Sequence, residues 1–221
     1  MLITISGLPG SGKSTVSRVL ADRMKLNYMN AGDIFRSLAQ KKGMTLEEFG
    51  IFAEQNPNVD RAIDKKIVEI AKKGNALLEG RLAGVMLERN GVKSMKVWID
   101  APLKVRAERV AKREAKTIEF VVGEIQERER SEWDRYFKLY NIDLNDLSFY
   151  DIIIDSAPIT ADDVANQVQK AVAQAIKEKG DEMPQAGAAA APIVHKGDIE
   201  LEGLEGTGLG GEGGDKDEGG P

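Results

Sequence analysis

The chain has 221 residues, of which 42% are apolar, so it can bury the core of a sizeable domain and is not a wholly disordered protein. It contains no cysteine and a single histidine, His195, which excludes disulfides, thiolate catalysis, Cys-based zinc sites and Ser-His-Asp chemistry. The net charge of −5 is uneven: residues 180–221 carry ten acidic and two basic residues, and the remainder is mildly basic. A mildly basic domain of this kind suits the binding of a small anionic ligand better than the binding of a long nucleic acid.

Apolar runs and helical spacings alternate along the body of the chain. Strands are expected at residues 1–6, 27–30, 76–78, 95–99 and 150–154, where short apolar runs end at turn residues. Helices are expected at residues 13–24 and 31–42, from 45, after 57, at 102–113, at 117–140 and at 160–177. Strands that alternate with helices predict an α/β fold with a parallel sheet of five strands, covered on both faces.

The composition changes at Gly180. Twelve of the 23 glycines lie in residues 180–221, so we expect a folded domain of residues 1–179 followed by an acidic, disordered tail. Residues 193–204 alternate apolar side chains weakly, which leaves an added edge strand as an alternative there. Because the sequence shows neither a membrane-spanning apolar run nor a signal-peptide pattern, we expect a soluble cytoplasmic protein.

The most specific pattern is a glycine-rich loop that fits GxxxxGK[ST] between the first strand and the first helix. It comprises Gly7, Leu8, Pro9, Gly10, Ser11, Gly12, Lys13, Ser14 and Thr15. Glycines let backbone N–H groups point at phosphate oxygens, and the helix start adds free amides. Lys13 is expected to reach the β- and γ-phosphates and the Ser14 hydroxyl to bind Mg²⁺. The loop predicts a bound nucleoside triphosphate, and the missing NKxD and LSGGQ-type strings exclude GTPase switches and transport ATPases.

Two segments at the ends of predicted strands indicate a second anion site. In residues 30–36, Gly32 permits a close backbone approach and Arg36 lies one helical turn on. In residues 79–84, Glu79 can hold Mg²⁺ or its waters, and Arg81 can bind a phosphate with paired donors. Ligands bind at the carboxyl ends of strands in open parallel sheets, so both segments are candidates for an acceptor site.

Two groups of charged residues occupy single helix faces. Arg106, Arg109 and Arg113 have i, i+3, i+7 spacing in one predicted helix, and Arg128, Glu132 and Arg135 have i, i+4, i+7 spacing in the next. Such faces are also typical of solvated surfaces with salt bridges, and 30% of this chain is charged. Beside a phosphate loop we interpret the arginines as a clamp, because phosphoryl transfer needs positioning and charge neutralisation.

Several other residues favour structural interpretations. Trp98 in a predicted strand is expected in the core. Asp100 follows that strand and can assist Mg²⁺, but strand ends often carry acidic turn residues, and we favour the second interpretation. Trp133, Tyr136 and Tyr140 share a helix face, which favours packing over a base-stacking platform. His195 in the tail is expected to be solvated.

The order of these segments is similar to that in nucleoside monophosphate kinases. The phosphate loop is followed by AGDIFR (31–36), EGRLAG (79–84), the helix with Arg109 and Arg113, and RERSEWDRY (128–136). With FKLYNIDLNDLSFYDIIIDS (137–156), the chain resembles the archaeal type of cytidylate kinase from residue 1 to about residue 178. The phosphate loop is generic, whereas AGDIFR, EGRLAG and the Tyr-Asn-Ile-Asp run are far more particular to this family.

The resemblance implies a P-loop NTPase-type three-layer fold with a small helical acceptor-binding domain at about residues 31–73 and a short lid at about 113–128. It implies catalytic roles for Lys13, Arg109, Arg113, Arg128 and Arg135, with Arg109 also against the ATP base. It implies acceptor binding by Gly32, Asp33, Arg36, Gly80, Arg81 and Glu132, and Mg²⁺ near Ser14 and Glu79. The chain departs from related bacterial enzymes at Leu82, where they carry an aspartate that reads cytosine, and it lacks their insertion in the acceptor domain.

The resulting expectation is an ATP-dependent kinase that converts CMP or dCMP to the diphosphate, with AMP or UMP as alternative acceptors. It is expected to work with Mg²⁺, as a monomer, without nucleic acid and without a membrane. Two further classes stay open. One is a small-molecule P-loop kinase with a hydroxyl acceptor such as shikimate or a sugar acid, and the other is a nucleotide-dependent binding module that presents its acidic tail to a basic partner.

Asp33 separates the two kinase classes, because it is the obvious candidate for a carboxylate base near an acceptor hydroxyl. Asp33→Asn should abolish turnover in a hydroxyl-acceptor kinase. It should cost much less in a monophosphate kinase, since the attacking phosphate oxygen is already anionic. Steady-state kinetics of the variant with each class of acceptor tell the two apart.

Overall fold

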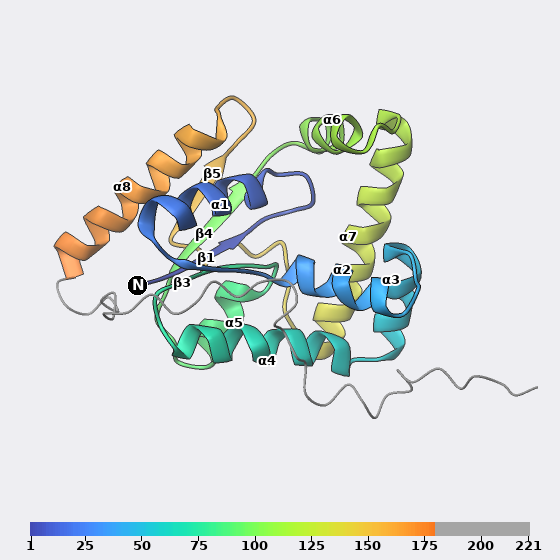
Figure 1. The fold of residues 1–221 in the computed structure, drawn as a ribbon, viewed down its shortest axis with the longest axis horizontal. Helices are drawn as coiled ribbons and strands as arrows, with labels where there is room; N and C mark the ends of the chain where they lie inside the picture. Colours follow the sequence, from blue (N-terminus) through green and yellow to red (C-terminus); the bar gives the residue numbers. More distant parts are fainter. Residues whose placement is uncertain (180–221) are drawn as a thin grey trace, which may run out of the picture.

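A sheet of five parallel strands forms the centre of the fold in the computed structural model, which describes residues 1–179 (Figure 1). The strands are β1 (Leu2–Ser6), β2 (Asn27–Asn30), β3 (Ala76–Glu79), β4 (Met95–Asp100) and β5 (Ile152–Asp155). Their order in the sheet is β2-β3-β1-β4-β5. The predicted five-stranded parallel sheet is therefore confirmed. The predictions of an acidic tail and of an edge strand at 193–204 lie outside the described residues.

Eight helices connect and follow the strands within the described part of the chain. They are α1 (Lys13–Met24), α2 (Ala31–Lys41), α3 (Leu46–Gln55), α4 (Asn58–Lys72), α5 (Ala83–Arg89), α6 (Leu103–Glu114), α7 (Ile118–Tyr140) and α8 (Ala161–Lys179). Helix α5 was not predicted, because seven residues with a glycine among them show little periodicity. No helix in residues 1–179 is long and apolar enough to cross a bilayer.

The predicted boundaries hold closely except at the last strand. Strand β5 begins at Ile152 instead of Tyr150, because the Tyr150 N–H closes a turn onto the carbonyl of Leu147 (3.1 Å). The predicted start of the third helix is confirmed in detail. The Thr45 hydroxyl accepts a hydrogen bond from the Glu48 N–H, and the Glu48 carboxylate accepts one from the Thr45 N–H, which is a capping box.

Apolar side chains cover the sheet on both faces, so the core lies in two layers. Helices α1 and α8 pack on one face, against Ile3 and Ile5 of β1. Helices α4 and α5 pack on the other, in the same cluster as Leu2 and Leu78. Side chains alternate between the faces of a strand, and every residue of β1 is buried, so both faces of this strand are covered. Trp98 of β4 is buried as predicted.

Helices α2, α3 and α4 form a helical group beside α7, at one end of the sheet (Figure 1). Its centre is Phe49 of α3, which is 1% exposed. The Phe49 ring meets Phe35 of α2 edge-on, with 4.7 Å between ring centres, and stacks on Phe52 at 5.7 Å. Tyr136 and Tyr140 of α7 pack against the same cluster, which confirms packing roles for these two residues.

The strand register brings the carboxyl ends of the strands to one edge of the sheet. Glu79 at the end of β3 is level with Asn30 at the end of β2 and with Ile5 of β1. On the other side, Asp100 ends β4 level with Asp155 of β5. The phosphate loop leaves β1 at this same edge, so the topology gathers the loop and the strand-end residues in one place.

The aromatic centre of the helical group gives a stability prediction. Phe49→Ala should lower the free energy of unfolding by about 3–5 kcal/mol, because it leaves a cavity where Phe35 and Phe52 now pack. Ile51→Ala on the same helix is the matched control, since Ile51 is 52% exposed and its loss should cost little. Urea denaturation of both variants measures the difference, and equal costs would contradict a core at Phe49.

Candidate active site

The phosphate loop, residues 7–15, runs from β1 into the first turn of α1. Asn30, Thr45 and Thr117 cap α2, α3 and α7 with their side chains. In contrast, Gly12 precedes α1 with φ 91°, and no side chain of the described residues caps that helix. The first N–H groups of α1 are therefore available to an anion, as the sequence predicts for a phosphate site.

The loop lies directly on the backbone of α6. Gly10 has φ 81°, and a Cβ there would lie 2.6 Å from the carbonyl oxygen of Arg106, so only glycine fits. The buried Arg106 side chain donates hydrogen bonds to the carbonyls of Pro9 (3.1 Å) and Ala101 (2.9 Å) and pairs with Glu129 of α7. Arg106 thus connects the phosphate loop, through the Pro9 carbonyl, to Glu129 of α7.

Lys13 lies at the centre of the positive charges. Its Nζ donates to the carbonyl oxygen of Leu8 across the loop (3.0 Å). Loss of hydration around the ammonium group and, next to it, the nearby charge of Arg81 lower the pKa of Lys13 to about 7, while Glu79 acts in the opposite direction. A lysine with such a low pKa has too little negative charge around it to stabilise its ammonium form. The oxygens of a bound phosphate group provide that negative charge.

Ser14 and Glu79, the predicted Mg²⁺ residues, lie in contact. The Ser14 hydroxyl donates to Glu79 Oε1 (2.6 Å), and the hydroxyl of Tyr28 donates to the other carboxylate oxygen. Burial and the Glu79 charge raise the pKa of Tyr28, so this phenol stays a donor. A hydroxyl and a carboxylate at the loop are oxygen ligands of the kind that Mg²⁺ prefers, so these residues fit the ion beside bound phosphates.

Arg81 joins three parts of the site. Its guanidinium group donates to the carbonyl of Gly7 in the loop and to the carboxylate of Glu132 on α7. The residue is 8% exposed, and its Nη2 has no hydrogen-bond partner in the described part of the chain. A buried, unpaired cationic donor next to the phosphate loop is suited to a second phosphate group.

Glu132 holds two arginines in place. Its second oxygen accepts from Arg128 Nε (2.7 Å), four residues earlier on α7. Burial raises the pKa of Glu132, but the adjacent Arg81 and Arg128 charges outweigh burial and keep that pKa well below its usual range. The carboxylate therefore remains ionised and balances the two cations while no substrate is bound.

Arg109 is fixed on the opposite side of the loop. Its Nη2 donates to the carbonyl of Ser156 (2.6 Å), and its Nη1 to the hydroxyl of Ser156 (2.9 Å) and the carbonyl of Ser11 (3.3 Å). The guanidinium thereby joins the loop to the residue that follows β5. Ser156 was not predicted, although its position after a strand end is a signal that could have found it.

Three predicted arginines have partners away from the loop. Arg36 pairs with Asp33 (2.6 Å) and its side chain is about half exposed, although it lies close to Gly32. Arg113 pairs with its neighbour Glu114 at the exposed end of α6. Arg135 is buried, and its Nε donates to Asp60 of α4 (2.9 Å). The structure thus brings Lys13, Arg81 and Arg128 together at the loop, with Arg135 near enough to Arg128 for its charge to act on it, while Arg36 and Arg113 pair elsewhere.

The helices α4 and α7 are joined by a second buried polar pair. The hydroxyl of Tyr140 donates to Asp64 Oδ2 (2.8 Å), one turn from Asp60. Burial raises the pKa of Asp64 to about 7, although the hydrogen bond from Tyr140 acts against this. Spacing on α7 predicted that Arg135 shares a face with Arg128 and Glu132 and that Tyr140 shares one with Trp133 and Tyr136, but not which residues of α4 they meet.

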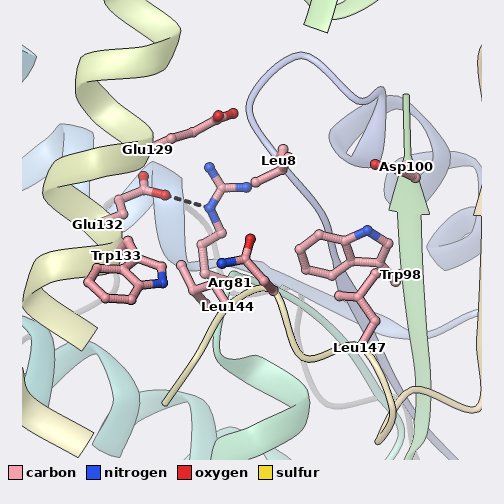
Figure 2. A pocket seen from close by; sticks show the side chains of 10 residues that line it. Leu8, Arg81, Trp98, Asp100, Glu129, Glu132, Trp133, Leu144 and Leu147 are labelled. Atoms are coloured by element: carbon pink, nitrogen blue, oxygen red, sulfur yellow. Dashed lines mark hydrogen bonds and ion pairs between the residues drawn. The ribbon is translucent and has the colours of Figure 1, made fainter. Parts of the chain in front are cut away.

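A cavity of about 220 Å³ adjoins Arg81, between α7 and the end of β4 (Figure 2). In Figure 2, Glu129, Glu132 and Trp133 of α7 lie on one side of it and Trp98 and Leu147 on the other, with Arg81 between them. The full lining is Leu8, Arg81, Trp98, Asp100, Glu129, Glu132, Trp133, Leu144, Asn145 and Leu147. Trp133 also stacks on Phe137, so it combines packing with a place at the cavity. The cavity was not predicted, because its walls come from distant segments.

The sequence matches the family model "Cytidylate kinase-like family" over residues 2–158. It is 47% identical over 173 residues to the cytidylate kinase of Methanocaldococcus jannaschii, an alignment that covers 78% of this chain and 97% of that protein. It is 45% identical over 178 residues to the cytidylate kinase of Methanococcus aeolicus, covering 80% of this chain and all of that one.

Among solved structures, the fold is similar to that of shikimate kinase from Acinetobacter baumannii in complex with shikimate. The TM-score is 0.51 with 15% sequence identity, and the match covers 78% of this chain and 93% of that one. At this identity the likeness concerns the fold alone. It agrees with the predicted P-loop fold around a five-stranded parallel sheet.

The low pKa of Lys13 predicts that ATP binding is linked to proton uptake. At pH 8 a lysine with a pKa of about 7 is mostly neutral, and phosphate oxygens beside the ammonium raise that pKa, so about one proton should be taken up per ATP. Calorimetric titration in buffers of different ionisation enthalpy measures the uptake. Lys13→Arg keeps a permanent charge and should bind ATP without it. Uptake that persists in this variant would assign the proton to another group.

Proposed function

The chain belongs to the cytidylate kinase-like family, and from this we propose that it transfers the γ-phosphate of ATP to CMP, and to dCMP, giving ADP and CDP or dCDP. One observation carries the proposal: the buried guanidinium group of Arg81, bonded to Gly7 of the phosphate loop, has an unpaired donor among the described residues. The loop then takes the phosphates of the donor while Arg81 takes the phosphate of the acceptor.

On the donor side, the open amides at the start of α1 and the Lys13 ammonium bind the phosphates of ATP. Ser14 and Glu79 hold Mg²⁺, which, when bound, neutralises charge on those phosphates. Arg109 lies against the ATP base, which its fixed position beside Ser156 supports.

On the acceptor side, we assign residues 31–73 to the part that encloses the monophosphate and residues 113–128 to a lid. Gly32, Asp33, Arg36, Gly80 and Arg81 line the acceptor phosphate, and Glu132 meets the ribose hydroxyls. Arg113 and Arg135 act on the moving phosphoryl group only if they exchange Glu114 and Asp60 for phosphate oxygens. The exchange of partners takes place when residues 31–73 and 113–128 close over the bound substrate.

The chemistry requires no general base, because the attacking oxygen of a nucleoside monophosphate is already anionic. What opposes the reaction is repulsion between two polyanions that must meet in line. Arg81 and Arg128 lie near enough to Lys13 for their charges to lower its pKa, and in a partly dehydrated site such fixed cations stabilise the transferring group. We also propose that the enzyme acts as a cytoplasmic monomer that needs no nucleic acid.

A coupled assay with Mg²⁺ and ATP tests the proposal with CMP, dCMP, UMP and AMP as acceptors in parallel. CMP should give the highest kcat/KM, with dCMP next. Turnover with none of the four would reject the function, and a clear preference for AMP or UMP would replace the acceptor. Turnover only with shikimate or a sugar acid would favour the hydroxyl-acceptor class.

A further inference from the structure

A chain of side-chain hydrogen bonds runs from β2 to the phosphate loop. The Asn30 amide nitrogen donates to the hydroxyl oxygen of Tyr28 (3.2 Å), and the Tyr28 hydroxyl donates to Glu79 Oε2. The other carboxylate oxygen, Oε1, accepts from the Ser14 hydroxyl (2.6 Å). Ser14 and Glu79 fit Mg²⁺, whereas Tyr28 and Asn30 have no part in the phosphoryl transfer proposed above.

The strand pairing explains why these side chains meet. Tyr28 and Asn30 are two residues apart on β2, so both project from one face of the sheet. Asn30 is level with Glu79 at the end of the neighbouring strand β3, so the Glu79 side chain projects from the same face. Tyr28 packs in the apolar cluster of the face that α1 covers, and Ser14 lies in the first turn of this helix.

Both hydroxyl donors to Glu79 are uncharged. Glu79 is 3% exposed, and the hydroxyls of Ser14 and Tyr28 satisfy its oxygens without neutralising its charge. A buried charge is costly unless opposite charge lies near it. The two hydroxyls therefore fix the direction of a carboxylate that keeps its negative charge for a cation at the phosphate loop.

Asn30 holds Tyr28 and the start of α2 at the same time. Its amide nitrogen bonds to Tyr28, while its side-chain oxygen accepts from the Gly32 N–H (2.8 Å) and caps α2. Asn30 is 7% exposed, so its amide is held between these two partners inside the protein. Because both ends of the amide are used, the position of the Tyr28 hydroxyl is tied to the first turn of α2.

We propose that Tyr28 is a positioning residue for phosphoryl transfer: its hydroxyl holds the Glu79 carboxylate against Ser14, in the orientation that serves Mg²⁺ beside the phosphates of ATP. Asn30 in turn fixes the Tyr28 hydroxyl. Residues that bind metals in proteins depend on such hydrogen-bonded partners, whose loss weakens metal binding by about 10-fold to 100-fold. This inference rests on the proposed function and adds the residues that orient its Mg²⁺ site.

Tyr28→Phe tests the assignment, because it removes the hydroxyl and keeps the ring that packs in the cluster with α1. Calorimetric titration with ATP, once with Mg²⁺ and once with EDTA, gives two affinities for each protein and needs no acceptor. The ratio of the affinity with Mg²⁺ to the affinity with EDTA should fall by about 10-fold relative to the wild type. The affinity for ATP in EDTA should stay unchanged.

Tyr140→Phe is the matched control. The Tyr140 hydroxyl also donates to a buried carboxylate, that of Asp64 (2.8 Å), but this pair joins α4 to α7 beside the apolar cluster on the other face of the sheet. The variant should lose stability in urea and keep the wild-type ratio.

Asn30→Ser is the second test variant, because a serine can still cap α2 but cannot supply the amide donor to Tyr28. The ratio should fall in the same direction as in Tyr28→Phe, by a smaller factor. Urea denaturation of each variant shows whether its fold is retained.

Two results would overturn the inference while the wild-type kinase activity stands. One is an unchanged ratio in Tyr28→Phe, whether both affinities hold or both fall alike, and the other is a ratio that falls as far in Tyr140→Phe. An unchanged ratio in Asn30→Ser would overturn the role of Asn30. A wild-type enzyme without turnover of any monophosphate would instead overturn the proposed function. The two failures are distinguishable, because the calorimetric ratio is measured without an acceptor.

Discussion

The buried ion pair between Arg81 and Glu132 is the interaction on which the rest of the site depends. It connects the residue after β3 with α7, and through the Gly7 carbonyl it also reaches the phosphate loop. Charges removed from water are stable only when they are paired and hydrogen-bonded. Glu132 pairs with both Arg81 and Arg128. These two ion pairs fix the position of α7 along its axis relative to the end of β3. The position of the helical group that packs against α7 follows from this constraint.

The residues around that pair remain short of negative charge. The start of α1 lacks a side-chain cap, Lys13 is held with a lowered pKa, and Arg81 retains an unpaired donor, all within the described chain. Each of these features costs stability in the protein without substrate. Each is relieved by phosphate oxygens, so binding of nucleotides and stability of the fold are coupled. Under the proposed function, a site for two polyanions is preorganised in this way before either arrives.

The contacts of Arg106, Arg109 and Arg135 illustrate the limit of helix spacing. A period of 3.6 residues assigns side chains to a common face, but not the segment that this face meets. Arg106 and Arg109 lie on one face of α6, yet they bind different segments. Arg106 donates to the carbonyl of Pro9 in the phosphate loop, and Arg109 donates to the carbonyl of Ser156 after β5. Arg135 finds its partner in Asp60, 75 residues earlier in the chain. Such pairings depend on the packing of elements that are distant in sequence.

By itself, the sequence determined the phosphate loop, the five strands and the position of Glu79 at the end of a strand on the same edge as the loop. Local patterns carry these features: a contiguous motif, an alternation of apolar runs, and the rule that parallel strands present their carboxyl ends at one edge. Only the tertiary structure decided the cavity beside Arg81 and the set of charges that share it. Its walls come from β4, α7 and the segment that follows α7, and no local pattern shows how far apart such segments lie once the sheet and its helices have packed.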